Sequence, residues 1–127
     1  KTPKLRLNVR LNKNRVQLSI DLAGESLHRR GYRLASGPAP LKENLAAALL
    51  LRSGWPEISM RGGGLIDPMC GGGTFLIEAA MIAGDIAPGL LRGKFGFEYW
   101  AFHEAPVWES LVSEAKARRV IGLKNLH

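Results

Sequence analysis

A short stretch near the middle of the chain, Leu65 to Glu78, constrains the fold more than any other part of the sequence. It reads Leu-Ile-Asp-Pro-Met-Cys-Gly-Gly-Gly-Thr-Phe-Leu-Ile-Glu. We expect a very short buried strand that ends at Asp67, a glycine turn, and a helix that begins at Thr74. In α/β proteins with parallel strands such a turn binds nucleotides, because glycines admit a ligand close to the backbone and the helix offers free N–H groups.

The spacing of this turn separates three classes of nucleotide ligand. A P-loop needs a lysine after its last glycine, but Gly73 is followed by Thr74. A dinucleotide fingerprint would place a glycine where Leu76 stands, which weakens that interpretation without excluding it. The pattern Asp-x-x-x-Gly-x-Gly of S-adenosylmethionine sites fits as Asp67, Gly71 and Gly73. An acid there attracts the cofactor's sulfonium and amino group, whereas it would repel a pyrophosphate.

The first quarter of the chain carries the whole net charge of +7. Nine Lys/Arg stand against two acids in residues 1–33, while nine of each sign cancel in residues 34–127. Residues 4–11 and 15–22 alternate between apolar and polar side chains, which predicts an antiparallel hairpin with an apolar and a basic face. A basic face suits a polyanion, and a solvated strand surface is the alternative.

Residues 24–40 have the glycines and prolines of a linker and contain the densest basic stretch, His-Arg-Arg-Gly-Tyr-Arg at 28–33. Cations that bind phosphates and a ring that stacks on a base suit RNA. The candidate RNA-binding residues are Arg29, Arg30, Tyr32 and Arg33. A basic linker that binds neighbouring carboxylates or carbonyl groups of the same protein is an equally good interpretation.

Three helices are expected after the linker. Residues 41–53 are rich in Ala and Leu on nearly every side, which predicts a largely buried helix. Residues 74–83 form the second, on which we expect Glu78 to meet solvent or to cap a helix end. Residues 107–119 form an amphipathic third. Helix, strand, glycine turn and helix in this order are typical of an α/β sheet with parallel strands.

Composition excludes several classes of protein. A chain of 127 residues allows one domain, or one domain and part of another. No apolar run approaches the roughly 20 residues of a membrane helix, so we expect no membrane partner. A single cysteine, Cys70, excludes an internal disulfide and a zinc site of several thiolates, and we expect no metal. The N-terminus lacks a signal-like segment, so we expect an internal piece of a longer cytoplasmic protein.

The residues from Asp67 to Ala80 resemble motif I of the THUMP-linked RNA methyltransferases, among which the bacterial 23S ribosomal RNA guanine-N2 methyltransferases are the most similar. The resemblance continues upstream through residues 24–33 and 40–50, and downstream through 85–89 and 95–100. It covers most of residues 5 to about 115, so it is far more specific than a glycine pattern.

This resemblance implies the N-terminal, incomplete part of a Rossmann-like S-adenosylmethionine-dependent methyltransferase domain at residues 41–127. Residues 1–23 would end a THUMP-like RNA-binding domain, and 24–40 would be a basic linker. The residues expected to bind the cofactor are Asp67, Pro68, Cys70, Gly71, Gly73 and Thr74. The family usually has Ser where this chain has Gly72, which removes a hydroxyl but should keep the backbone path.

The reaction implied is methyl transfer from S-adenosylmethionine to the exocyclic N2 of a guanine in 23S ribosomal RNA. The family's catalytic Asn-Pro-Pro-Tyr type loop has no counterpart, because no two of the seven prolines are adjacent. We therefore expect no catalytic residue in this chain and no activity from it alone. Two alternatives stay open: a non-catalytic RNA-binding module with a scaffold Rossmann half, and a DNA amino-methyltransferase.

Overall fold

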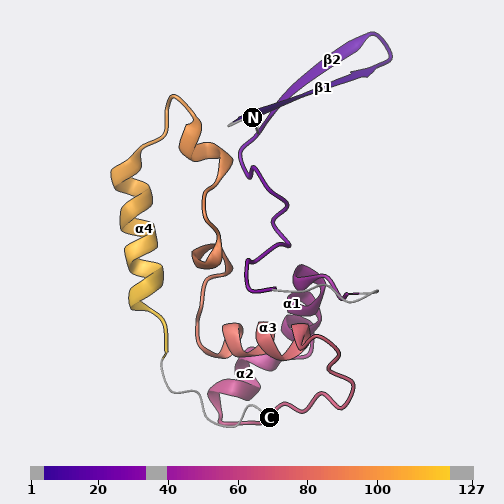
Figure 1. Ribbon diagram of the computed structural model, residues 1–127, viewed down its shortest axis with the longest axis vertical. Coiled ribbons are helices and arrows are strands. Elements are labelled where there is room, and N and C mark those ends of the chain that lie inside the picture. The colour runs from indigo at the N-terminus through magenta and orange to yellow at the C-terminus, as the bar shows by residue number, and fades with distance from the viewer. Residues whose placement is uncertain (1–4, 34–39, 121–127) are drawn as a thin grey trace.

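The structure, a computed structural model, describes residues 5–33 and 40–120. Figure 1 shows a hairpin at one end of the molecule, three clustered helices at the other, and α4 along the side between them. In chain order the elements are β1 Arg6–Asn12, β2 Arg15–Asp21, α1 Glu43–Arg52, α2 Trp55–Met60, α3 Thr74–Ala83, the 3₁₀ helices η1 Pro88–Leu91 and η2 Gly96–Tyr99, and α4 Ala105–Ala117.

The structure confirms the hairpin that the alternating apolar and polar side chains predict. β1 and β2 pair antiparallel, and Lys13 and Asn14 connect them with φ of 45° and 58°. Positive φ at both central residues is the type I′ turn that matches the twist of two strands. Val9 pairs with Leu18 on the apolar face, where they are 67% and 74% exposed. The basic face lies on the opposite side, because side chains alternate along a strand.

A close backbone approach joins the hairpin to η2. The N–H of Phe97 donates to the carbonyl of Leu22 at 2.9 Å. A Cβ on Gly96 would lie 2.6 Å from the carbonyl oxygen of Asp21, which real structures do not tolerate. Gly24, on the other side of this contact, has a φ of +79°. Glycine is therefore required at both positions, by space at Gly96 and by backbone conformation at Gly24.

The helical cluster packs around three buried side chains: Leu50, Trp55 and Ala79. The indole N–H of Trp55 donates to the carbonyl oxygen of Ala79 at 2.8 Å, so the one polar group of the ring is satisfied. Gly54, with a φ of +77°, separates α1 from α2, and Pro56 lies in the first turn of α2, where its missing N–H has no consequence.

The expectation that the first helix is largely buried is wrong for the described residues. Its buried residues are Glu43, Ala46 and Leu50, which face α3, whereas Leu45 and Leu49 are about half exposed. Composition gives the apolarity of a helix, but the burial of each face depends on which elements pack against it.

The segment after α3 is anchored by aromatic rings. Phe95 and Phe97 both make edge-on contacts with Trp108 of α4, with ring centroids 5.4 Å and 4.9 Å apart. These contacts hold α4 against the segment that contains η2. The helix begins at Ala105, two residues before the predicted start, because Pro106 is well placed in a first turn.

The predicted strand at residues 65–66 is reduced to a single bridge at Leu65. Over residues 5–33 and 40–120 the hairpin is the one sheet, and no parallel pair of strands is seen there. Two residues offer too few backbone groups for a ladder of their own. No described helix is long and apolar enough to cross a membrane.

Replacing Leu50 by Ala should lower the free energy of unfolding by about 2–5 kcal/mol, since its buried side chain would leave a cavity. Leu51, next in the chain and 59% exposed, provides the matched control: Leu51→Ala should change stability by about 0.5 kcal/mol or less. Urea denaturation followed by circular dichroism measures both. Equal losses in the two variants would contradict the packing described.

Candidate cofactor site

The turn before α3 has the geometry that a tight ligand loop needs. The carboxylate of Asp67 accepts the N–H of Met69 at 3.0 Å, and the N–H of Gly73 donates to the carbonyl of Cys70 at 2.8 Å. Gly73 is the N-cap of α3 and no side chain caps the helix. The first N–H groups of α3 therefore point into the turn without a side-chain acceptor.

Two of the three glycines are required by their backbone conformation. Gly71 and Gly73 have φ of +52° and +71°, in the region that side chains disfavour. Gly72 is not among the positive-φ residues, and a Cβ there would meet nothing within 4 Å. The family's Ser would therefore fit at Gly72, and the departure noted in the sequence leaves the backbone path unchanged.

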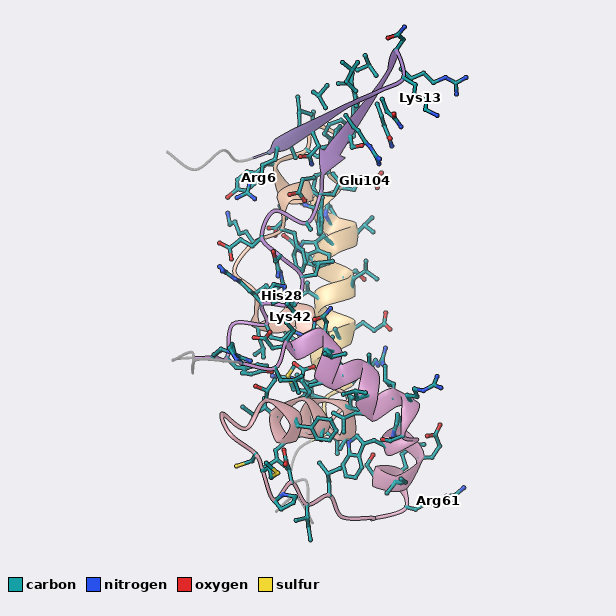
Figure 2. All side chains as sticks on the ribbon, turned by 90° about the vertical axis from the view of Figure 1, so that its right-hand side faces the viewer. Arg6, Lys13, His28, Lys42, Arg61 and Glu104 are labelled. Atoms are coloured by element: carbon teal, nitrogen blue, oxygen red, sulfur yellow. The ribbon has the colours of Figure 1, made fainter. Side chains whose placement is uncertain are left out.

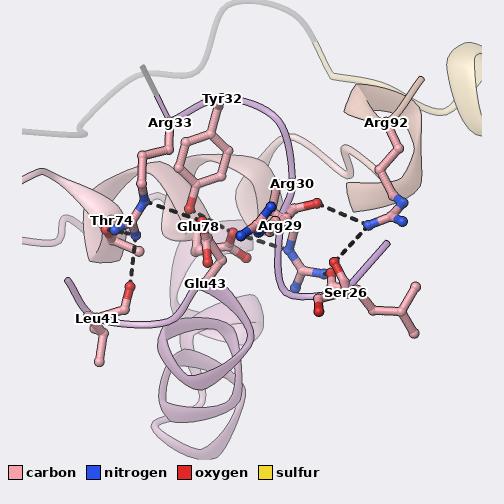
Figure 3. Close-up of polar contacts among 11 residues, drawn as sticks. Ser26, Arg29, Arg30, Tyr32, Arg33, Leu41, Glu43, Thr74, Glu78 and Arg92 are labelled. Carbon is pink, nitrogen blue, oxygen red and sulfur yellow. Dashed lines mark hydrogen bonds and ion pairs between the residues drawn. The ribbon is translucent and has the colours of Figure 1, made fainter. Parts of the chain in front are cut away.

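The linker reaches this turn through Arg33. Its guanidinium donates to the hydroxyl of Thr74 at 2.9 Å and to the carbonyl of Leu41 at 2.8 Å, and it pairs with the buried carboxylate of Glu43 at 3.3 Å (Figure 3). The sequence predicts that Thr74 binds the cofactor and that Arg33 binds RNA. The structure brings these two residues into direct contact, and Arg33 thereby joins α1 to the start of α3.

Glu78 is the second buried carboxylate of the site, with 2% of its surface exposed. Its Oε1 accepts the hydroxyl of Tyr32 at 2.9 Å and the Nε–H of Arg30 at 3.4 Å (Figure 3). The expectation that Glu78 meets solvent or caps a helix is wrong. A buried carboxylate is stable only when paired and hydrogen-bonded, and the linker provides both.

The pKa of Tyr32 is raised above its ordinary value. Burial of the ring is the largest cause, followed by the hydrogen bond to Glu78 and the negative charges of Glu78 and Glu43. All of these disfavour a phenolate. The neutral hydroxyl therefore remains a donor to Glu78 over the usual range of pH.

The remaining RNA candidate, Arg29, is exposed, and no side-chain contact is seen for it among the described residues. Its carbonyl accepts a hydrogen bond from Arg92 at 3.1 Å. Arg92 also donates to the carbonyls of Ser26 and Glu25, and its guanidinium lies over the ring of Phe95. Arg30, Tyr32 and Arg33 thus bind within the protein, as the alternative interpretation of the linker expected, while Arg29 faces solvent. RNA binding by these four residues stays a prediction.

The other predicted cofactor residues lie along the turn. Pro68, Cys70 and Gly71 are exposed, Asp67 is half-buried and Thr74 is buried. The sequence did not predict the contacts that Glu78 and Arg92 make with the linker. For Glu78 the available signal was a glutamate within the apolar stretch of residues 75–83. Nothing in the local sequence marks Arg92.

Solved structures of methyltransferases superpose on this chain. A methyltransferase in complex with SAH superposes with a TM-score of 0.80 at 38% identity, over 95% of this chain and 30% of that chain. A structure from Listeria monocytogenes, described as a predicted N6-adenine-specific DNA methylase, gives a TM-score of 0.78 at 43% identity, over 94% of this chain and 30% of that chain. The chain therefore has the fold of part of a methyltransferase.

The chain belongs to the family of RMKL-like methyltransferase domains, because the model of that family matches residues 30–126. It is 61% identical to the ribosomal RNA large subunit methyltransferase K/L of Cellvibrio japonicus and 60% identical to that of Allochromatium vinosum, over 98% of this chain in each case. The chain spans 17% of the length of these relatives. The resemblance seen in the sequence is confirmed.

Replacing Tyr32 by Phe should lower the free energy of unfolding at pH 7 by about 1.5–3 kcal/mol, because a hydrogen bond to a charged group is removed. The native pKa of Tyr32 lies above its unfolded value, so its contribution is present below the unfolded pKa of about 10 and falls as the pH rises beyond it. The difference in the free energy of unfolding between the wild type and Tyr32→Phe should therefore shrink as the pH rises past that value. Urea denaturation of both proteins from neutral to alkaline pH measures this, and a constant difference would contradict the role given to the hydroxyl.

Proposed function

We propose that this chain provides the cofactor-binding turn of a methyltransferase that transfers a methyl group from S-adenosylmethionine to the exocyclic N2 of a guanine in 23S ribosomal RNA. The turn at residues 67–74 is the observation that carries the proposal, in a chain 61% identical to a ribosomal RNA methyltransferase. The proposed enzyme is a longer cytoplasmic protein, in which residues 1–23 end a THUMP-like domain and residues 41–127 begin the methyltransferase domain after the linker at 24–40.

The turn fits a ligand that lies against the backbone. Nothing lies within 4 Å of the positions that Cβ atoms would take on Gly71 and Gly72, so a molecule can approach the main chain there. Asp67 stands at one end of the turn and the uncapped start of α3 at the other. An acid and a set of free N–H groups match a ligand that carries both positive and negative groups.

The cofactor, when bound, brings a methyl group on a positively charged sulfur. Asp67 attracts the cationic groups of such a ligand, and the N–H groups at the start of α3 donate to its carboxylate. Gly71 and Gly73 keep the backbone path that exposes those N–H groups. Thr74 is held by Arg33, so in this proposal it fixes the start of the helix beside the ligand. The groups that accept the substrate amine are expected outside this chain.

A DNA amino-methyltransferase is the second candidate. The structure from Listeria monocytogenes, 43% identical over 94% of this chain, is described as a DNA methylase. Both reactions move a methyl group to an exocyclic nitrogen, so the turn alone serves either. The ribosomal relatives are more similar to this chain, and the basic hairpin and linker also support an RNA substrate.

Replacing Asp67 by Asn should weaken binding of S-adenosylhomocysteine to the full-length protein by about 10- to 100-fold, because a charged partner is removed. Asp85→Asn is the matched control: it removes one negative charge at an exposed residue that pairs with Arg118, outside the turn. Isothermal titration calorimetry measures both affinities. Equal affinities in the wild type and Asp67→Asn would contradict the site.

The substrate is tested with tritiated S-adenosylmethionine and the full-length protein. We expect label in unmodified 23S ribosomal RNA and its recovery as N2-methylguanosine after digestion to nucleosides. Label on adenine in DNA would replace the proposal by its second candidate. Cofactor binding without label in either nucleic acid would favour a non-catalytic RNA-binding module.

A further inference from the structure

A cleft of about 970 Å³ lies beside the cofactor turn, between the linker and residues 91–99. None of residues 67–74 lines it, although Arg33, which holds Thr74, does. Figure 2 places His28 and Lys42, both on its wall, between the hairpin and the helical cluster. The cleft is therefore a separate surface that runs from the base of the hairpin to the start of α1.

The charge of this cleft is strongly positive. Its walls carry seven Lys/Arg against Glu25 and Glu43. Arg33 offsets Glu43, and Arg30 is paired with the buried Glu78. The cations left without an acidic partner among the described residues are Arg6, Arg29, Lys42, Arg92 and Lys94. Like charges gathered around one cleft repel each other, and a polyanion relieves that repulsion.

An aromatic ring completes the lining. Tyr99 is 41% exposed and the ammonium of Lys94 lies 5.7 Å from its ring centroid. The nearby half-buried rings of Phe95 and Phe97 pack against Trp108, and Phe95 also lines the cleft, where Tyr99 is the more exposed ring. Cations that follow a phosphate backbone together with an exposed ring are the features by which proteins bind single-stranded nucleic acid.

We propose that this cleft binds single-stranded RNA, with Arg29, Lys42 and Lys94 on its phosphates and Tyr99 stacked on an unpaired base. The choice of RNA rests on the proposed function. S-adenosylmethionine carries a net positive charge, so the cleft repels the cofactor while it attracts the substrate. Arg33 lines the cleft and also contacts Thr74 of the cofactor turn. An RNA strand held in the cleft would therefore lie next to that turn.

The test uses the full-length protein and a short unstructured RNA labelled with fluorescein, with affinity measured by fluorescence anisotropy over about 50–200 mM salt. Arg29→Gln with Lys94→Gln should weaken binding and reduce the salt slope by about 0.7 for each phosphate that the protein no longer neutralises. Arg52→Gln with Arg61→Gln removes the same charge at exposed positions that do not line the cleft, and should leave the slope unchanged. Figure 2 shows Arg61 at the end of the molecule away from the hairpin.

Tyr99→Leu tests the stacking and should weaken binding about 5- to 100-fold without a change in the salt slope, because the ring carries no charge. All variants should keep wild-type affinity for S-adenosylhomocysteine and wild-type melting curves, which separates this proposal from the proposed function. Equal slopes in the two double variants would overturn the cleft as a phosphate site. Displacement of the RNA by an equal concentration of DNA of the same sequence would overturn its assignment to RNA.

Discussion

Two buried carboxylates, Glu43 on α1 and Glu78 on α3, set the conditions that the rest of this structure must meet. Neither can lie in an apolar environment without a partner, since removing one member of a buried pair leaves an uncompensated charge that costs about 3–5 kcal/mol. The partners come from the linker: Arg33 on Glu43, and Arg30 and Tyr32 on Glu78. The linker is thereby fixed across the two helices that carry the site.

This arrangement explains why the cofactor turn and the basic cleft are neighbours. Arg33 holds Thr74 at the start of α3 and also lines the cleft, so one side chain positions both surfaces. Arg92 holds the carbonyls of the turn at residues 25–29, which presents Arg29 outward. The basic stretch of the linker therefore has two parts, one that holds the fold together and one that faces solvent.

The sequence predicted the features that depend on local pattern. The hairpin followed from strict alternation, the start of α3 from the glycines that precede it and its end from Gly84, and the family from the residues around Asp67. The sequence did not predict the burial of Glu78 and left two interpretations of the linker cations open, because their contacts join residues more than 40 positions apart in the chain. The exposed leucines of α1 were missed for the same reason: burial depends on which elements pack on a helix.

A crystal structure of the full-length protein with S-adenosylhomocysteine bound would test the cofactor turn and its support by the linker together. We expect the ligand against residues 71–74, with its amino group toward Asp67 and its carboxylate at the start of α3. Arg33 should keep its contacts with Glu43 and Thr74. A ligand bound in the basic cleft, with the glycine turn empty, would show that the turn is not the cofactor site.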